Sequence, residues 1–477
     1  MDEPTQKSRA PPALIAKENT LQNRIAQLNS HLLRLEEGTL KFEKTQQQLA
    51  LQRQKHAQFL DSLRIEFTDY ASLHQQSNFL DIQEIQKELI QEESLLLEYF
   101  VGQKNIVLFV LDGQNIQCLK WEKPSDLIDR IANLWESILN YPSAESQEEE
   151  NRYLENYIQE AHHLYQLLIQ PLQALSNNKD HLHIIPSEVL SFVPFDVLLA
   201  TIPEKTNSTK FKNFDYLLQK YQTDFQFSAN EILETTNQKL SQQDFFAGFA
   251  PKFGQENSPF TSLHYNELEI KQIQELTNGH YFLNKEATRK QFETVLNDYA
   301  IIHLATHAKA SPQNGDLSYL AFTAADSSLQ NALFYLQDLA QYRIPSQLIV
   351  LSACETALGN YQQGEGVQNL ARAFVRSGAK SVMTTLWKID DRTTPQLMQH
   401  FYKNLKAGQN KSQALQEAKK AYLKEVPNSK AHPFYWGAFI LNGSTDPIEF
   451  PATFNWSMLT WVLLLLLGLL FAYFQFK

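Results

Sequence analysis

The chain has 477 residues, 43% of them hydrophobic, which is enough for two or three domains with a large buried core. Its 53 acidic and 42 basic residues give a net charge of −11, and no basic cluster interleaved with aromatics marks a nucleic-acid partner. Only two cysteines are present, Cys118 and Cys354, which excludes a disulfide framework and argues against a thiolate zinc site. The first residues contain no apolar run, so we expect no secretory signal.

The N-terminal part favours helices. Residues 1–13 contain three prolines and mixed charge, and we expect them to be disordered. Residues 14–67 then repeat apolar side chains at spacings of seven or fourteen, at Leu21, Leu28, Leu35, Phe42, Leu49 and Leu63. This helical, coiled-coil-like segment has two open interpretations: a surface for a partner protein, or an amphipathic pair packed on the chain's own globular part.

Near residue 95 the spacing of apolar residues is no longer helical, which predicts a region that contains both strands and helices. Apolar runs at 95–101 and 105–111 and a third run ending near Trp121 predict strands joined by short turns. Helices are expected between about 125 and 176. Two short apolar segments follow at 183–186 and 192–199, and a polar stretch at 204–213 is expected to be a loop.

The second half alternates strands and helices. Strands are expected near 245–249, 299–304, 319–323, 348–352, 381–385 and 435–441. Helices are expected at 287–297, 366–377, 393–406 and 411–424. This alternation predicts an α/β fold with a doubly wound, mostly parallel sheet flanked by helices.

Two of these strands end at reactive side chains. The apolar run that begins at Ala300 ends at His307, and the run that begins at Gln347 ends at Cys354. Because ligands bind at the carboxyl ends of such strands, we expect the imidazole and the thiol to meet if the strands are neighbours. Cys354 would be the nucleophile and His307 the base, with the backbone amides of Cys354 and Ala308 binding the oxyanion. The alternative is a buried structural cysteine and a strand-end histidine.

Other polar residues near these strand ends can each be interpreted in two ways. His303 lies inside its strand, so we interpret it as a core residue or an orienting one. The turn around Glu365, between Gly364 and Gly366, fits a substrate loop better than a phosphate-binding loop. Asp390 and Asp391 either form a solvated turn or helix N-cap, or line a specificity pocket for a basic side chain. Nothing in the sequence points to a metal or a cofactor.

The C-terminal stretch 456–474 has no charged residue, and as a helix it would span roughly 28 Å, close to the thickness of a bilayer core. Aromatic residues lie near both of its ends. We therefore expect a single-pass transmembrane anchor after a linker at 444–455. Because we expect no secretory signal and a functional free thiol at Cys354, we expect the protein to be anchored in the cell membrane with its soluble part in the cytoplasm.

An ordered series of motifs resembles the CHAT domain, a caspase-like module often found behind TPR repeats in bacteria. The motifs are Asp69-Tyr-Ala-Ser-Leu, Leu96-Leu-Glu-Tyr-Phe, Ile185-Pro186, Phe192-Val-Pro-Phe195, His303-Leu-Ala-Thr-His307, Leu351-Ser-Ala-Cys354-Glu-Thr356, Gly364-Glu-Gly366, Leu386-Trp387, Asp391 and Phe434-Tyr-Trp-Gly437. The resemblance covers roughly residues 65–443. It implies a caspase-hemoglobinase fold and a Cys–His peptidase dyad at Cys354 and His307. The family usually has Gly after the histidine, whereas this chain has Ala308, and clear TPR repeats are missing.

The expected organisation follows from these observations. Residues 68–240 would form a non-catalytic half of the CHAT module, and residues 241–443 the catalytic half. The leading hypothesis is a membrane-anchored, caspase-like cysteine endopeptidase that acts on protein substrates and is regulated by an activating or adaptor protein bound to the N-terminal helices. The alternatives are a catalytically silent, membrane-tethered scaffold and another thiol-dependent hydrolase or transferase.

Overall fold

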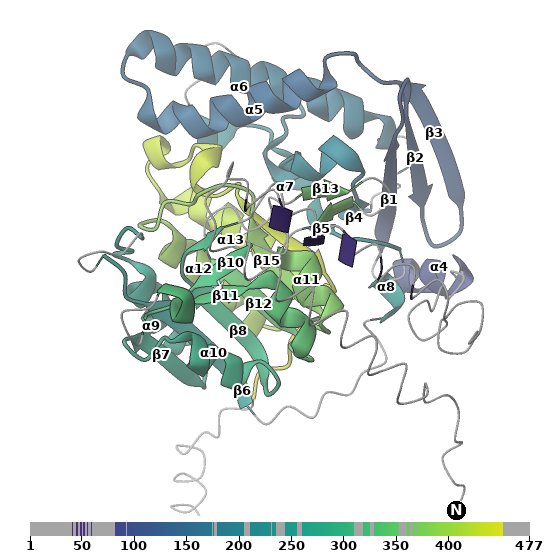
Figure 1. Ribbon diagram of the computed structural model, residues 1–477. Coiled ribbons are helices and arrows are strands. Elements are labelled where there is room, and N and C mark those ends of the chain that lie inside the picture. The colour runs from purple at the N-terminus through teal and green to yellow at the C-terminus, as the bar shows by residue number, and fades with distance from the viewer. Residues whose placement is uncertain are drawn as a thin grey trace, which may run out of the picture.

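The structure is a computed structural model. It describes residues 82–451 apart from 92, 174, 176–178, 205–209, 230, 235–243, 255–259, 310–317, 325–328, 353–359, 363–365 and 369, together with nine positions between 41 and 59. Among these residues the fold is α/β, with one large sheet covered by helices (Figure 1).

The large sheet has eleven strands in the order β3-β2-β1-β4-β5-β16-β15-β12-β8-β6-β7. The strands are β1 Ser94–Val101, β2 Asn105–Leu111, β3 Ile116–Glu122, β4 His181–Ile185, β5 Gln222–Phe225, β6 Asp244–Pro251, β7 His280–Asn284, β8 Tyr299–Ala305, β12 Leu348–Ser352, β15 Ser381–Thr385 and β16 Phe439–Gly443. Two small sheets add β9 Ala308–Lys309, β10 Tyr319–Ala321 and β11 Leu333–Tyr335, and β13 Asn360–Gln362 and β14 Gly366–Gln368.

Most neighbouring strands of the large sheet run parallel. The antiparallel pairs are β1 with β2, β2 with β3, and β15 with β16. Strand β16 comes late in the chain, yet it lies between β5 and β15 and joins the strands of the two halves into one sheet. The predicted mostly parallel α/β sheet is therefore confirmed. The boundary near residue 240 stays a prediction.

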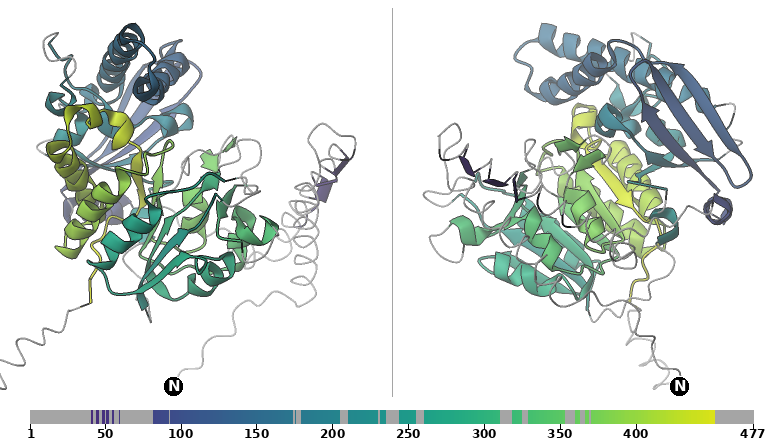
Figure 2. Two further views of the ribbon diagram at one scale, coloured as in Figure 1. Left: turned by 90° about the vertical axis from the view of Figure 1, so that its left-hand side faces the viewer. Right: turned by 45° about the vertical axis from the view of Figure 1, so that its right-hand side comes forward.

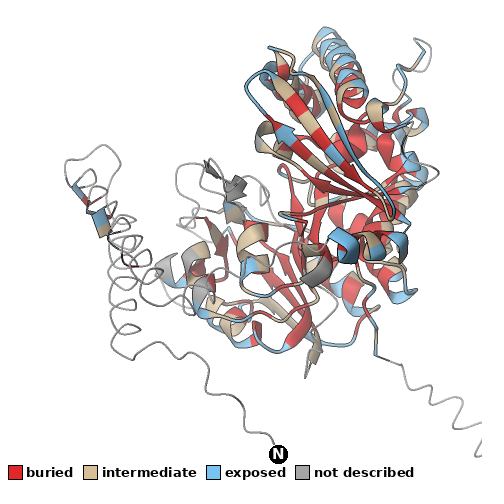
Figure 3. Cartoon of the chain, turned by 90° about the vertical axis from the view of Figure 1, so that its right-hand side faces the viewer, coloured by how far each residue is buried: buried red, intermediate tan, exposed pale blue. Residues whose placement is uncertain are grey.

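Helices cover both faces of the sheet (Figure 2). They are α4 Ile82–Gln91, α5 Leu127–Asn140, α6 Gln147–Leu168, α7 Leu217–Lys220, α8 Glu231–Glu234, α9 Asn266–Gln274, α10 Arg289–Val295, α11 Leu370–Arg376, α12 Thr394–Lys406 and α13 Lys411–Glu425. Alternate residues of β8 and β12 enter two different core clusters: Ile301 and Leu348 join that of α5, α6, α12 and α13, and Ile302 and Ile349 join that of α10 and α11. Such strands are buried on both faces, which explains their continuous apolar sequence (Figure 3).

The predicted strands and helices agree with many of these elements, but there are differences. Strand β7 and helix α9 were not predicted, because their sequences mix polar and apolar residues without a clear period. The strand expected near 319–323 belongs to a small separate sheet. The apolar segment 192–199, for which no element type was predicted, contains a short 3₁₀ helix at Phe195–Val197.

The N-terminal segment is described only in part. The nine described positions between 41 and 59 are helical, and Leu49 and Phe59 are buried there. Residues 1–40 and 60–81 lie outside the described part of the chain.

The predicted membrane anchor is corrected. Within the described ranges no helix is both long and apolar enough to cross a membrane, and residues 456–474 lie outside them. Helix α6, with 22 residues, is long enough to cross a bilayer. It is not apolar enough, because Glu148, Glu149 and Glu150 occupy its first turn. We therefore withdraw the prediction of a single-pass anchor in the cell membrane with a cytoplasmic soluble part.

Candidate active site

Strands β8 and β12, which precede the two reactive residues, are direct parallel neighbours. Ala305, the last residue of β8, pairs with Ser352, the last residue of β12. His307 and Cys354 each follow two residues later in the sequence. Cys354 itself lies outside the described residues, as does Glu365. The predicted adjacency of the two strands is confirmed, whereas the dyad stays a prediction.

The His307 ring is held in one orientation by a backbone carbonyl. Its Nε2 atom lies 2.8 Å from the carbonyl oxygen of Thr261, so Nε2 carries the proton and donates it. The ring of Phe260 stacks on the imidazole at 5.5 Å, and the Phe253 ring lies 4.8 Å away. In the neutral ring this tautomer leaves Nδ1 as the proton acceptor, as a general base requires.

The surroundings of His307 lower its pKa below 6.5. The largest cause is partial burial, which disfavours the imidazolium, and the nearby ammonium of Lys388 acts in the same direction. The Thr261 carbonyl and the carboxylate of Asp391 oppose this shift. The imidazole is therefore neutral at physiological pH and available to accept a proton.

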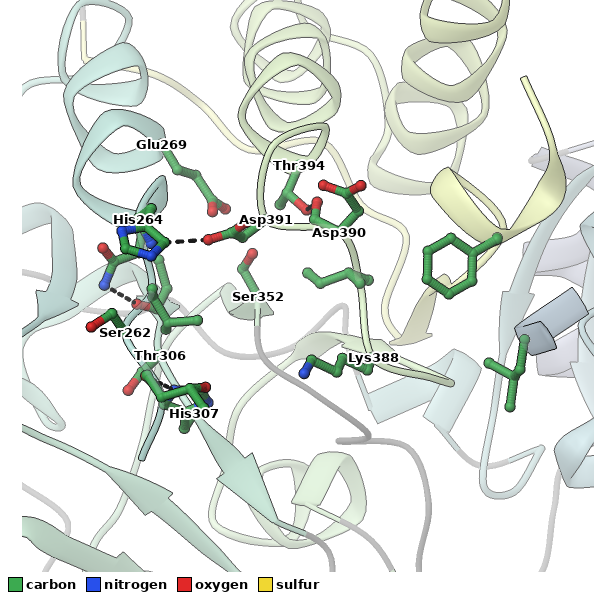
Figure 4. A pocket seen from close by; sticks show the side chains of 17 residues that line it. Ser262, His264, Glu269, Thr306, His307, Ser352, Lys388, Asp390, Asp391 and Thr394 are labelled. Carbon is green, nitrogen blue, oxygen red and sulfur yellow. Dashed lines mark hydrogen bonds between the residues drawn. The ribbon is translucent and has the colours of Figure 1, made fainter. Parts of the chain in front are cut away.

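A cavity of about 420 Å³ opens beside His307 at the carboxyl ends of β8, β12 and β15. Figure 4 shows its polar side chains, among them Thr306, Ser352 and Lys388. Leu139, Leu263, Ile389 and Phe434 supply apolar wall. Among the described side chains that line it, the Ser352 hydroxyl is buried without a hydrogen-bond partner. The cavity thus combines apolar wall with many polar and charged side chains that a ligand could contact.

The two carboxylates after β15 have different surroundings. Asp390 forms an ion pair with Lys430 at 3.3 Å and accepts a hydrogen bond from the Arg392 amide, so it stabilises the turn that leads into α12. Asp391 accepts a hydrogen bond from the backbone amide of His264 at 3.0 Å and faces the cavity (Figure 4). Both aspartates line the cavity, and they differ in that only Asp390 forms an ion pair, with Lys430, among the described residues.

A buried polar chain lies next to the cavity. His303 is fully buried, and its two ring nitrogens contact Glu269 Oε1 at 2.9 Å and the Tyr402 hydroxyl at 3.0 Å. Glu269 also lines the cavity. His303 is therefore a core residue that fixes a carboxylate of the cavity wall, in line with both parts of its sequence interpretation.

Ala308 begins β9 and pairs with Leu320 of β10. The Ala321 amide donates to the His307 carbonyl, which makes Ala308 and Leu320 a non-hydrogen-bonded pair of the antiparallel ladder. The Ala308 amide therefore points away from β10. This orientation is compatible with the predicted role of Ala308 as an oxyanion donor.

Several cavity residues were not predicted from the sequence. Thr261, Glu269 and Lys388 come from different parts of the chain, and no spacing links them to His307. Ser352 carried a usable signal, because it ends the same strand that leads to Cys354.

One comparison with known proteins identifies a family. A family model, the CHAT domain, matches residues 159–444. Tetratricopeptide repeat protein 28 from Homo sapiens is 32% identical over 137 residues, and the Mus musculus protein of that name is 33% identical over 137 residues. These matches cover 28% of this chain and 5% of each relative, so the chain spans a small part of their length.

Among solved structures, the Saccharomyces cerevisiae separase–securin complex at 2.6 Å resolution aligns with 92% of this chain and 38% of that chain. The sequence identity is 9% and the TM-score is 0.47. A second structure of the same complex, at 3.0 Å, aligns with the same coverage at 10% identity.

Proposed function

The chain belongs to the CHAT domain family, and from that premise we propose that it is a cysteine endopeptidase of the caspase-like type, with Cys354 as nucleophile and His307 as base. The observation that carries the proposal is the pairing of Ala305 with Ser352, since it sets the two strands that lead to these residues side by side. The neutral, oriented imidazole of His307 supports it further.

The proposed reaction begins when His307 Nδ1 takes the proton of the Cys354 thiol. The sulfur attacks the peptide carbonyl carbon and forms a tetrahedral intermediate, whose oxyanion accepts hydrogen bonds from the backbone amides of Ala308 and Cys354. His307 then gives its proton to the leaving amine as the C–N bond breaks. Water, deprotonated by the same imidazole, hydrolyses the thioester and regenerates the thiol.

The cavity supports a preference for a basic residue before the scissile bond. Asp390 and Asp391 both line this space, but the carboxylate of Asp390 is already paired with Lys430, which leaves Asp391 as the proposed contact. The apolar wall would pack along the methylene stem of Lys or Arg, and Asp391 would accept hydrogen bonds from its charged end. Glu365, on the turn after Cys354 in the sequence, is a further proposed contact to the substrate.

The test is cleavage of a peptide library by the full chain beside Cys354→Ala and His307→Ala. We expect both substitutions to abolish cleavage without changing the unfolding temperature. Equal cleavage by the unchanged chain and by both variants would refute the proposal. Regulation by an adaptor protein bound to residues 14–67 is part of the proposal. If the purified protein alone cleaves no peptide, the assay is therefore repeated with cell extract as a source of the adaptor.

A thiol-directed probe separates this function from a catalytically silent scaffold. Cys118 is free and exposed on β3, so the labelling is done in a Cys118→Ser background. An active dyad predicts rapid labelling of Cys354 that falls in His307→Ala. The presence of Ala308 where the family usually has Gly favours the catalytically silent scaffold. For a scaffold, labelling of Cys354 would be slow and would not change in His307→Ala. Identified products would distinguish a peptidase from another thiol-dependent hydrolase or transferase.

A further inference from the structure

A second polar cluster lies far from the cavity, inside the sheet of the N-terminal half. His181 and His183 are two residues apart on β4, so their side chains lie on one face of the sheet. His183 pairs with Asp224 of the neighbouring strand β5, which places this carboxylate on that same face. Two histidines on one strand and a carboxylate on the next can present three ligand atoms to one point.

The three groups converge closely and are sealed from solvent. His181 Nε2 lies 2.7 Å from Asp224 Oδ2, and His183 Nδ1 lies 2.9 Å from Asp224 Oδ1. The exposed fractions are 2%, 2% and 0% for His181, His183 and Asp224. One atom from each group lies within 4.8 Å of the others. A fourth polar group, the hydroxyl of Ser412, lies 3.1 Å from His181 Nε2.

We propose that this cluster binds a structural Zn²⁺ ion through His181 Nε2, His183 Nδ1 and the carboxylate of Asp224, with the Ser412 hydroxyl as the nearest fourth donor. Zinc takes nitrogen and carboxylate ligands in a tetrahedral arrangement, in which ligand atoms lie roughly 3.3 Å apart. The observed separations of 2.7 and 2.9 Å need only a small opening to admit the ion.

The surrounding hydrogen bonds are those that a metal site requires. The Ser94 hydroxyl lies 3.2 Å from His183 Nε2. With Ser94 as acceptor, Nε2 would carry the proton, and Nδ1, which contacts Asp224 Oδ1 in this structure, would coordinate the metal. Gln226 donates to Asp224 Oδ1 at 2.6 Å and orients the carboxylate. These contacts come from β1 and from the residue after β5, so the ligands are held from both sides.

Burial favours a structural ion over a catalytic one. A catalytic metal needs an open coordination position and access for substrate. The three ligands do not line the cavity beside His307, and each is almost completely buried. Ser412 lies in the first turn of α13, and Gln226 also donates to the Gly443 carbonyl of β16. An ion here would therefore connect β4 and β5 to α13 and β16, independently of any peptidase activity.

The test measures zinc in the purified full chain. We expect about one zinc ion per chain after growth with zinc, and a fall in unfolding temperature when a chelator removes it. His183→Gln and Asp224→Asn should bind zinc at least roughly tenfold more weakly. The matched control is His400→Gln, since His400 is a histidine of α12 that pairs with Glu425 at 3.0 Å and should not affect zinc content.

Two results would overturn the proposal. The first is a wild-type chain with no bound zinc, whose unfolding temperature changes neither with added Zn²⁺ nor with chelator; a triad held by hydrogen bonds alone predicts this. The second is a loss of zinc in His400→Gln as large as in Asp224→Asn, which would place the ion elsewhere. Should a ligand variant fail to fold, the wild-type titration with Zn²⁺ still decides.

Discussion

His307 Nε2 donates a hydrogen bond to the Thr261 carbonyl oxygen over 2.8 Å, across 46 positions of sequence. Because that oxygen belongs to the backbone, it can only accept, and it fixes which ring nitrogen carries the proton. The bond links the loop before α9 to the end of β8. It leaves Nδ1 to serve as the base in the proposed reaction.

The pKa of His307 is predicted to respond in opposite directions to its two charged neighbours. Lys388 lowers this pKa, so Lys388→Met should raise it. Asp391 raises the same pKa, so Asp391→Asn should lower it. Chemical-shift titration of histidine-labelled protein measures both, with His307→Gln to identify the resonance. Shifts of one sign in both variants would contradict this assignment.

The same pKa predicts the acid limb of activity. The reaction needs neutral His307, and burial holds its pKa below 6.5, so cleavage should persist as pH falls through 6.5 and be lost only at lower pH. The acid limb of kcat/KM measures this. In Lys388→Met the limb should move to higher pH, because the imidazolium is then less disfavoured. A wild-type limb above pH 6.5 would argue against His307 as the base.

Asp390 and Asp391 are predicted to differ in their effect on substrate choice. Asp391→Asn should lower kcat/KM for peptides with Lys or Arg before the scissile bond by roughly tenfold or more, since a charge-assisted contact is lost. Asp390→Asn is the matched control, because the Lys430 ion pair already occupies that carboxylate. Paired basic and neutral peptides measure the effect. Equal losses in both variants would show that Asp391 does not select the substrate.

Lys419 and Asp196 form a buried ion pair at 2.6 Å that connects α13 to the N-terminal half. Lys419→Met leaves Asp196 buried without its cation and should lower the free energy of unfolding by about 3–5 kcal/mol. Lys420→Met is the control: Lys420 pairs with partly exposed Glu417 and should change stability by less than about 1 kcal/mol. Urea unfolding measures both. A loss of similar size in the two variants would exclude a special role for Lys419.

His432 is predicted to make stability depend on pH. Burial lowers its pKa to about 3, so below pH 6.5 the unfolded chain binds a proton that the folded chain does not. Its contribution to stability is therefore complete above pH 6.5 and falls between pH 6.5 and 3, by about 2 kcal/mol at pH 5.

The variant His432→Asn isolates this effect. The asparagine oxygen can replace Nδ1 as acceptor for the Phe434 amide, which is 3.2 Å away in the native chain, but it does not titrate. Unfolding free energies of both proteins between pH 5 and 8 give the comparison. The variant should show a smaller loss on acidification, and identical pH profiles would mean that His432 is protonated equally in both states.

Part of the fold and of the site could be predicted from the sequence. Apolar runs located β8 and β12, because a strand buried on both faces needs an apolar side chain at almost every position. The same runs placed His307 directly after a strand. Strand β7 was missed because its five residues are only partly buried and lack that pattern.

The sequence by itself determined where chain segments become strands and which reactive residues follow them, since both depend on neighbours a few positions away. Only the tertiary structure decided that β16 lies between β5 and β15 and that the Thr261 carbonyl orients His307. It also decided that Asp390 pairs with Lys430, whereas Asp391 accepts a hydrogen bond from the His264 amide. It also brought His181, His183 and Asp224 together. These contacts join residues that are far apart in sequence. They depend on how the whole chain packs, and no local sequence pattern encodes that packing.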